Sequence, residues 1–413
     1  MAIPWLFLGV ELLAVYPLHI LMDDFPAAMI VVILNALTVE LFLLKQQRSM
    51  SITLTVAFFL RLLAAIFDSI TLNLSNMNSD CLGYFDAAKV FAEGHEATYG
   101  WMYSRLLGVA FRFAGSSRFL AEYINVILGL TTIWILYKSL ILISIDKRKI
   151  YFAVWVISVF PYSIYSSCVT YRETIIATFV ALSVYFALKW YLRQKWKNMF
   201  LCFASIAIAS TFHAGVVVMS LGFALLFTMY SYQTNRFAVN KKSIISLGLF
   251  LSAFALVVLV FPEVFFAKLS NMSEESIVTQ VNWNYGGSAY LSWLHPNSLL
   301  QVIIASPLKL LYFLFSPLPG DWRGIVDIVT FLIDGCVYLY CIYYTLKNYK
   351  ESKYRHFIAA IFIGWIITAL VFGLGTWTAG TAIRHRNKIF MVLLLITVMS
   401  SVRNDKERAQ DKI

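Results

Sequence analysis

The first residues that indicate chemistry lie in a polar stretch, residues 78–94, which follows a long apolar run. Asp80 and Tyr84 are four residues apart in this stretch. In a helix that starts near Ser79, this spacing places both on one face and turns Asp86 partly away. We therefore expect Asp80 and Asp86 to be catalytic carboxylates for acid–base work or cation binding, and Tyr84 to contact substrate. The alternative is structural, because a Ser-Asp pair also suits a helix N-terminus.

Arg172 and Glu173 lie where two apolar runs meet. An ionisable pair at such a junction is costly unless it is paired or lines a wet cavity. We expect Arg172 to bind a donor phosphate and Glu173 to orient the substrate or a neighbouring group. In the alternative, both side chains extend from an interfacial turn into water. His213 has a similar position, where it either hydrogen-bonds a phosphate or sugar or caps a helical hairpin.

Two later segments carry further binding candidates. Trp283 lies in a loop rich in aromatic and amide side chains, which stack on sugar rings but also form aromatic belts at membrane interfaces. Arg384, His385 and Arg386 directly precede the last apolar run. Because arginine binds phosphate oxygens with two parallel hydrogen bonds, we expect these three residues to bind the donor phosphate. The alternative is a basic turn beside the membrane.

The composition predicts the kind of structure that positions these residues. Hydrophobic residues make up 60 % of the 413-residue chain and charged residues only 13 %. Runs long enough to cross a bilayer recur along the whole length, which predicts an all-α polytopic membrane protein with about 12 transmembrane helices. The first run has no small-residue cleavage site after it and is expected to be a retained span. The expected spans are residues 4–22, 26–44, 51–72, 120–143, 150–169, 174–192, 198–212, 215–230, 243–262, 324–346, 357–375 and 388–402.

The distribution of lysine and arginine predicts the topology. The short loops on one side of the membrane are basic, and the positive-inside rule places them and both termini in the cytoplasm. The outer side then holds two long loops, residues 73–119 and 263–323, and the active site. Within them we expect interfacial helices at 99–114 and 299–316. The net charge of +11 follows this topology and does not predict nucleic-acid binding. The five cysteines have no metal-ligand spacing.

The order of these motifs resembles the GT-C superfamily of membrane glycosyltransferases, in particular bacterial proteins of surface-polysaccharide loci that are similar to protein mannosyltransferases. The resemblance covers about residues 60–400. It rests on sparse motifs: Asp80-x-x-x-Tyr84-x-x-x-Ala88, the segments FAGSSRF and YINVILG, residues 161–173, and RHRNKI before the last run.

The resemblance implies a polyprenyl-phosphate sugar donor, or a polyprenyl-pyrophosphate glycan, used on the outer face of the cytoplasmic membrane. Asp80 would be the base for the acceptor hydroxyl or a ligand of a divalent cation such as magnesium or manganese. Arg384 or Arg386 would hold the donor phosphate, assisted by Arg172. The chain departs from the family in two spans before residue 45, in Asp80-Cys81 where an acidic pair is common, and in having no soluble domain after Val402.

We therefore expect two N-terminal helices (1–44), a GT-C-like transmembrane core (45–402) and a basic cytoplasmic tail (403–413). Two alternatives to a single-sugar transferase stay open. A repeat-unit polysaccharide polymerase has the same size and a similar use of arginine and histidine. A transporter or flippase for a lipid-linked glycan would need charges buried midway through spans, for which the candidates are Arg61, Asp68 and Asp334.

Overall fold

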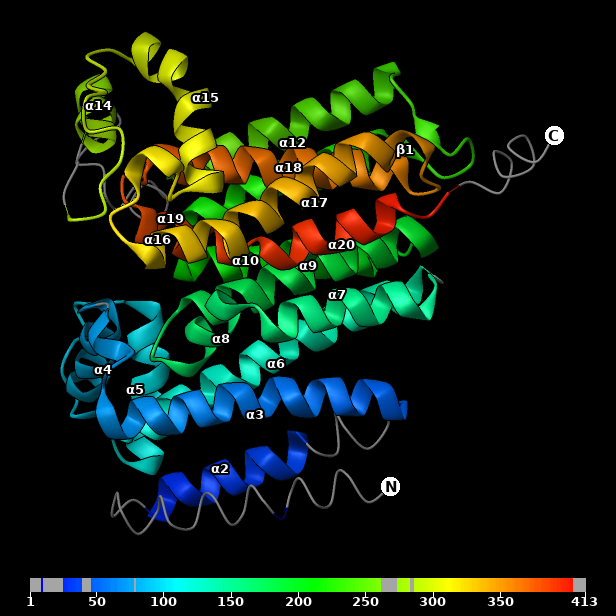
Figure 1. Cartoon of the computed structure of the whole chain (residues 1–413). Helices are drawn as coiled ribbons and strands as arrows, with labels where there is room; N and C mark the ends of the chain where they lie inside the picture. Colours follow the sequence, from blue (N-terminus) through cyan, green and yellow to red (C-terminus); the bar gives the residue numbers. More distant parts are fainter. Residues whose placement is uncertain are drawn as a thin grey trace. The chain divides into compact units, whose positions relative to one another are not determined.

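The computed structural model describes residue 9 and residues 25–38, 46–77, 79–143, 145–260, 273–282 and 286–403. These residues are mostly helical (Figure 1), which confirms the prediction of an all-α protein. A two-stranded hairpin, β1 (Tyr230–Ser231) with β2 (Arg236–Phe237), is the one sheet in the described part. The chain divides into two compact units: Met1–Lys138 with Asp146–Thr178, and Ser139–Ile145 with Phe179–Ile413.

Five helical stretches are long and apolar enough to cross a membrane. They are α3 (Arg48–Thr71), α6 (Arg118–Leu142), α9 (Glu173–Arg193), the continuous stretch Ile325–Glu351 and α18 (Arg355–Leu374). A bent pair of helices makes a sixth if it is counted as one span. These stretches fit an all-α membrane protein, whereas the total of 12 spans stays a prediction. All of the expected span 4–22 except Gly9, and the end of 26–44, lie outside the described residues.

The first unit contains α2 (Phe25–Thr38), α3, most of α6, and the shorter elements that build its polar end. Those elements are the 3₁₀ turn η2 (Ser75–Met77), α4 (Ser79–Ala92) and α5 (Met102–Ala114). α4 packs against both η2 and α5. α5 forms within the segment 99–114 that the sequence predicts to be helical.

The bent pair in this unit is α7 (Lys147–Val159) with α8 (Pro161–Cys168), and their axes differ by 53°. The expected span 150–169 is therefore broken. Proline fits the first turn of a helix but disfavours helical backbone at the residue before it, and Phe160 is extended here (φ −63°, ψ 119°). The break leaves carbonyl oxygens of α7 without helical N–H partners.

Arg61 of α3 supplies donors to those carbonyl oxygens. Its Nη1 lies 2.9 Å from Ser158 O, and its Nη2 lies 3.3 Å from Ile157 O and 3.0 Å from Ser163 Oγ. The side chain is completely buried. Because unsatisfied carbonyls are costly away from water, Arg61 stabilises the break.

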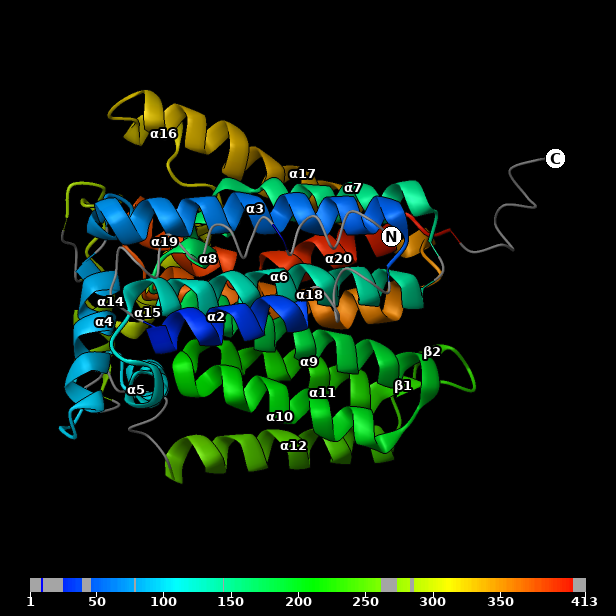
Figure 2. The ribbon, with the colours of Figure 1, turned by 90° about the horizontal axis from the view of Figure 1, so that it is seen from below.

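The second unit consists mostly of apolar helices, and Figure 2 shows α10, α11 and α12 side by side. α11 and α18 approach closely at Gly222 and Gly364, where a Cβ on Gly222 would lie 2.9 Å from Gly364 Cα. Small residues permit such close backbone approach. This unit also contains most of α9, the β1–β2 hairpin and η3 (Ala214–Met219). Its other elements, besides α18, are α10 (Trp196–Phe212), α11 (Ser220–Met229), α12 (Lys241–Val260), α14 (Glu274–Asn282), α15 (Leu299–Phe315), η4 (Pro319–Asp321), α16 (Ile325–Thr330), the π-helical η5 (Phe331–Gly335), α17 (Cys336–Asn348), η6 (Tyr349–Glu351), α19 (Ala379–Asn387) and α20 (Phe390–Ser400).

Candidate functional site

The polar stretch after α3 forms the predicted helix, α4. Tyr84 and Ala88 are buried, and Asp80 is half-buried. Asp86 is exposed, which agrees with its expected position away from that face. The spacing of four residues therefore predicted the face of α4 correctly.

The Tyr84 side chain lies at the centre of an aromatic group. Its ring centroid lies 5.3 Å from that of Tyr99 and 5.4 Å from that of Tyr103. Gly100 makes this packing possible, because its φ of +71° favours glycine and a Cβ there would lie 2.3 Å from Tyr84 Cδ1. Gly83 leaves room for Tyr99 in the same way, since its Cβ would lie 2.7 Å from Tyr99 Cε1.

Two chemically active side chains meet at this aromatic group. The Tyr99 hydroxyl donates a hydrogen bond to the Asp80 carboxylate. The Arg172 guanidinium lies over the Tyr84 ring, with Cζ 5.5 Å from the ring centroid, and its buried Nε has no hydrogen-bond partner in the described part of the chain. We call Asp80, Tyr84, Tyr99 and Arg172 the Tyr84 cluster. The cluster combines the Asp80 carboxylate with the Arg172 guanidinium, whose remaining N–H donors can bind an anion.

Asn125 of α6 fixes the loop that carries Arg172. Its Nδ2 lies 2.7 Å from Val169 O and 2.8 Å from Tyr171 O, and it is fully buried. Glu173 follows as a buried residue in the first turn of α9, where a carboxylate is favoured by the helix dipole. Asn125 and Glu173 are therefore best placed to position Arg172.

A second cluster, in the second unit, contains both expected histidines. The rings of His213 and His385 meet edge to face at 4.8 Å, and both contact Phe372. Lys388 Nζ lies 3.2 Å from His385 Nδ1 and is almost completely buried. We call His213, His385, Lys388 and Phe372 the His385 cluster. The sequence indicated the basic segment that contains His385 as a binding candidate. The structure places His213, which comes from a distant segment, beside His385.

The neighbouring arginines of α19 differ in their surroundings. Arg384 is buried, with 7 % of its surface exposed. Arg386 is fully buried, pairs with Asp334, and donates to Phe313 O (3.0 Å) and Ser316 O (2.8 Å). These contacts hold the end of α15 to α19. Arg386 therefore has a structural role that the sequence did not predict.

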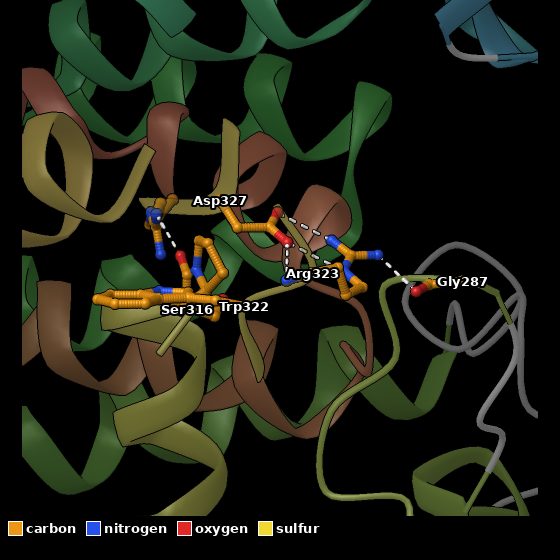
Figure 3. Close-up of polar contacts among 7 residues, drawn as sticks. Gly287, Ser316, Trp322, Arg323 and Asp327 are labelled. Atoms are coloured by element: carbon orange, nitrogen blue, oxygen red, sulfur yellow. Dashed lines mark hydrogen bonds and ion pairs between the residues drawn. The ribbon is translucent and has the colours of Figure 1, made fainter. Parts of the chain in front are cut away.

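Loop segments of the same unit meet near Arg323 (Figure 3). Its guanidinium forms a two-point ion pair with Asp327 and also donates to Gly287 O. Tyr290 donates to Thr376 O, which attaches the same loop to the segment before α19. Asp321 lies nearby in η4; burial raises its pKa, an effect that Arg323 partly opposes. Trp283 lies outside the described residues.

Arg61, Asp68 and Asp334, the three candidates for the buried charges of a transporter, all make structural contacts instead. Arg61 stabilises the α7–α8 break, and Asp334 pairs with Arg386. Asp68 accepts hydrogen bonds from Leu74 N (2.8 Å) and Ser75 N (2.9 Å). Sequence reasoning missed the buried Glu122, although a lone carboxylate inside an apolar run is itself an indication of function.

The described residues contain no group of three or more His, Cys, Asp or Glu side chains suited to hold a metal ion. Asp80 is followed by the buried Cys81, where the family that the sequence resembles commonly has a second acid. The donor set around Asp80 therefore does not fit a divalent cation, and the reaction proposed below uses none.

No protein-family model, curated protein or solved structure matches the chain.

Proposed function

We propose that the chain is an integral-membrane glycosyltransferase of surface-polysaccharide assembly that uses a polyprenyl-phosphate-linked sugar on the outer face of the cytoplasmic membrane. The observation that carries the proposal is the convergence of Asp80 and Arg172 on Tyr84. A carboxylate held by Tyr99 and an arginine with donor capacity left lie at one aromatic surface. Such a surface suits a sugar ring that is attached to a phosphate.

In the proposed reaction, Asp80 takes the proton of the acceptor hydroxyl as its oxygen attacks the anomeric carbon. The bond from that carbon to the phosphate oxygen breaks, and its electron pair leaves with the lipid phosphate. Arg172 stabilises the charge that develops on the phosphate. Tyr99, which is 43 % exposed, offers its ring to the sugar and orients the carboxylate with its hydroxyl. The expected contact of Tyr84 with substrate is left out, because Tyr84 is buried against Tyr99 and Arg172.

The second unit is proposed to bind an anionic headgroup at the His385 cluster and Arg384. A buried lysine beside two half-buried histidines favours an anion, because these side chains gather N–H donors and positive charge at one place next to the apolar Phe372. Arg386 is left out of this role because Asp334 and two carbonyl oxygens occupy its guanidinium. Asp86 is left out of the chemistry because it is exposed on another face of α4.

The test is the glycan profile, lipid-linked and surface, of cells that lack the protein. Complementation uses wild type, Asp80→Asn, Arg172→Gln and the control Glu93→Gln, which changes an exposed carboxylate just after α4. A uniformly truncated repeat unit, restored by wild type and Glu93→Gln alone, supports the proposal. Normal glycan from both Asp80→Asn and Arg172→Gln at wild-type protein levels refutes the assigned roles.

The same profile separates the alternatives. Loss of long chains with single repeat units retained would identify a repeat-unit polymerase. Complete units held on the inner leaflet would identify a transporter. The engagement of Arg61, Asp68 and Asp334 in structural contacts favours an enzyme over a transporter.

A further inference from the structure

Glu122, near the start of α6, is a buried carboxyl that the proposed reaction does not use. Its exposed fraction is 0 %, and neither of its carboxyl oxygens has a hydrogen-bond partner in the described part of the chain. An ionised carboxylate in such surroundings is strongly disfavoured. The group must therefore either carry a proton or be neutralised by a cation.

Asp68 of α3 lies near it: the Ser75 hydroxyl that donates to Asp68 lies 3.5 Å from Nη1 of Arg118, which is one helical turn before Glu122 on α6. Asp68 is also fully buried, but it accepts hydrogen bonds from the N–H groups of Leu74 and Ser75 and from the Ser75 hydroxyl. Three donors thus already satisfy the Asp68 carboxyl group, whereas Glu122 has none. Two neighbouring carboxyls cannot both be ionised cheaply away from water, and Glu122 is the one without donors.

The other charged and titratable groups that face the pair are Arg118, Cys168 and Arg61. Arg118 is half-buried and lies over the Phe85 ring, with Nη1 3.5 Å from Ser75 Oγ. It supplies one positive charge, which balances Asp68. The Arg61 guanidinium is engaged with the α7–α8 break, and the buried Cys168 thiol donates to Tyr165 O at 3.2 Å.

We propose that Glu122 and Asp68 form a proton-binding site in which Glu122 holds one proton and donates it to the Asp68 carboxylate. Binding is a simple protonation by water-borne H⁺ and needs no other reactant. Asp68 holds the backbone at the start of η2, and η2 packs against α4, which carries Asp80. The bound proton thus stabilises the segment that leads into the Tyr84 cluster. This site does not depend on the proposed glycosyl transfer.

The test is thermal unfolding of the full-length protein in detergent from about pH 5 to about pH 9. Unfolded glutamate loses its proton near its ordinary pKa of about 4.3, so a folded state that retains the proton loses stability as pH rises. The glutamine of Glu122→Gln has the same shape as a protonated glutamate and carries permanent N–H donors. Because it does not titrate, the loss of stability with rising pH disappears. We expect Glu122→Gln to melt above wild type, with a gap that widens on the order of 2 °C per pH unit.

Asp68→Asn is the matched variant. It melts below wild type at every pH, because Leu74 and Ser75 lose a charged acceptor. The proposal is overturned if Glu122→Gln melts below wild type and its unfolding midpoint changes with pH as that of wild type does. Glu122 is then ionised and paired. A wild-type midpoint that rises with sodium chloride but not with choline chloride, and not in Glu122→Gln, overturns it in favour of a sodium site.

If Glu122→Gln does not fold, infrared spectroscopy of the wild-type protein tests whether Glu122 carries a proton. The proposal requires a protonated-carboxyl C=O band in the wild-type protein at neutral pH that shifts on ¹³C labelling of glutamate. Absence of that band overturns it.

Discussion

The guanidinium of Arg386 forms a buried ion pair with the carboxylate of Asp334 within the second unit. Arg386 lies on α19 and Asp334 on the π-helical η5, and the same guanidinium donates to carbonyl oxygens at the end of α15. One side chain thereby joins three elements. The adjacent Arg384 and His385 keep their proposed role in binding an anion.

Removing one partner of this pair will destabilise the protein strongly, because it leaves a buried charge. Arg386→Met should lower the free energy of unfolding by about 3–5 kcal/mol. The double variant Arg386→Met/Asp334→Leu should recover part of that loss, since no unpaired carboxylate remains. Thermal unfolding in detergent measures both. A double variant no more stable than Arg386→Met would contradict this account of the pair.

Tyr99→Phe tests the orientation of Asp80. Phenylalanine keeps the ring that packs on Tyr84 but removes the hydroxyl that donates to the Asp80 carboxylate. A hydrogen bond to a charged group contributes about 1.5–3 kcal/mol, so we expect the rate of glycosyl transfer to fall by about tenfold or more. The unfolding midpoint should change little, because Tyr99 is 43 % exposed. An unchanged rate would show that Asp80 needs no help from Tyr99.

Two substitutions separate charge from geometry at Arg172. Arg172→Lys keeps a positive charge but loses the planar fork, and Arg172→Gln loses the charge as well. We expect KM for the lipid-linked donor to rise by about tenfold in the lysine variant and by more in the glutamine variant. Kinetics with a purified donor measure this. Equal effects of the two variants would mean that the planar fork matters and the charge alone does not.

Gly100→Ala and Gly94→Ala form a matched pair. Both glycines have positive φ, +71° and +98°, so each alanine adds a backbone penalty of about 1–2 kcal/mol. Only at Gly100 does the new Cβ also collide with Tyr84, whereas nothing lies within 4 Å at Gly94. Gly100→Ala should therefore melt lower than Gly94→Ala and lose activity in addition. Equal melting would indicate that the Tyr84 ring moves aside at no cost.

Asn125→Leu removes the donor that holds the loop before α9. The carbonyl oxygens of Val169 and Tyr171 are then left unsatisfied, at about 1–3 kcal/mol each. Stability should fall, and donor affinity should fall with it, because Arg172 follows this loop directly. Asn125→Asp should be worse at neutral pH, since it sets a carboxylate against the same carbonyls. If stability falls but the affinity for the lipid-linked donor is unchanged, the loop does not position Arg172.

The sequence predicted local geometry better than long-range contacts. The face of α4 that carries Tyr84 followed from a spacing of four residues, because helical periodicity is local. The hydrogen bond from Tyr99 to Asp80 could not be predicted, since it depends on a loop whose course is determined by Gly100. Likewise, Arg384 and Arg386 are equivalent in sequence, and only the packing of α19 against α15 distinguishes them.

Some of what was missed had an indication in the sequence. Pro161 within the apolar run 150–169 indicates a break that the expected continuous span did not include. The partner of the exposed carbonyls, Arg61, lies almost 100 residues earlier and had no such indication. Glu122 stood alone inside an expected span, where a carboxylate is costly. Its neighbour Asp68 comes from another helix, so the pair appears only once the chain has folded.

The contact between Arg61 and the α7–α8 break has a consequence for how the protein is made. The bend at Phe160 depends on donors from a helix that is synthesised earlier. We therefore expect the segment after Asp146 to acquire its kink only once α3 lies beside it, because hydrocarbon offers its open carbonyls no substitute donor. The order in which the helices arrive would then contribute to the shape of the first unit.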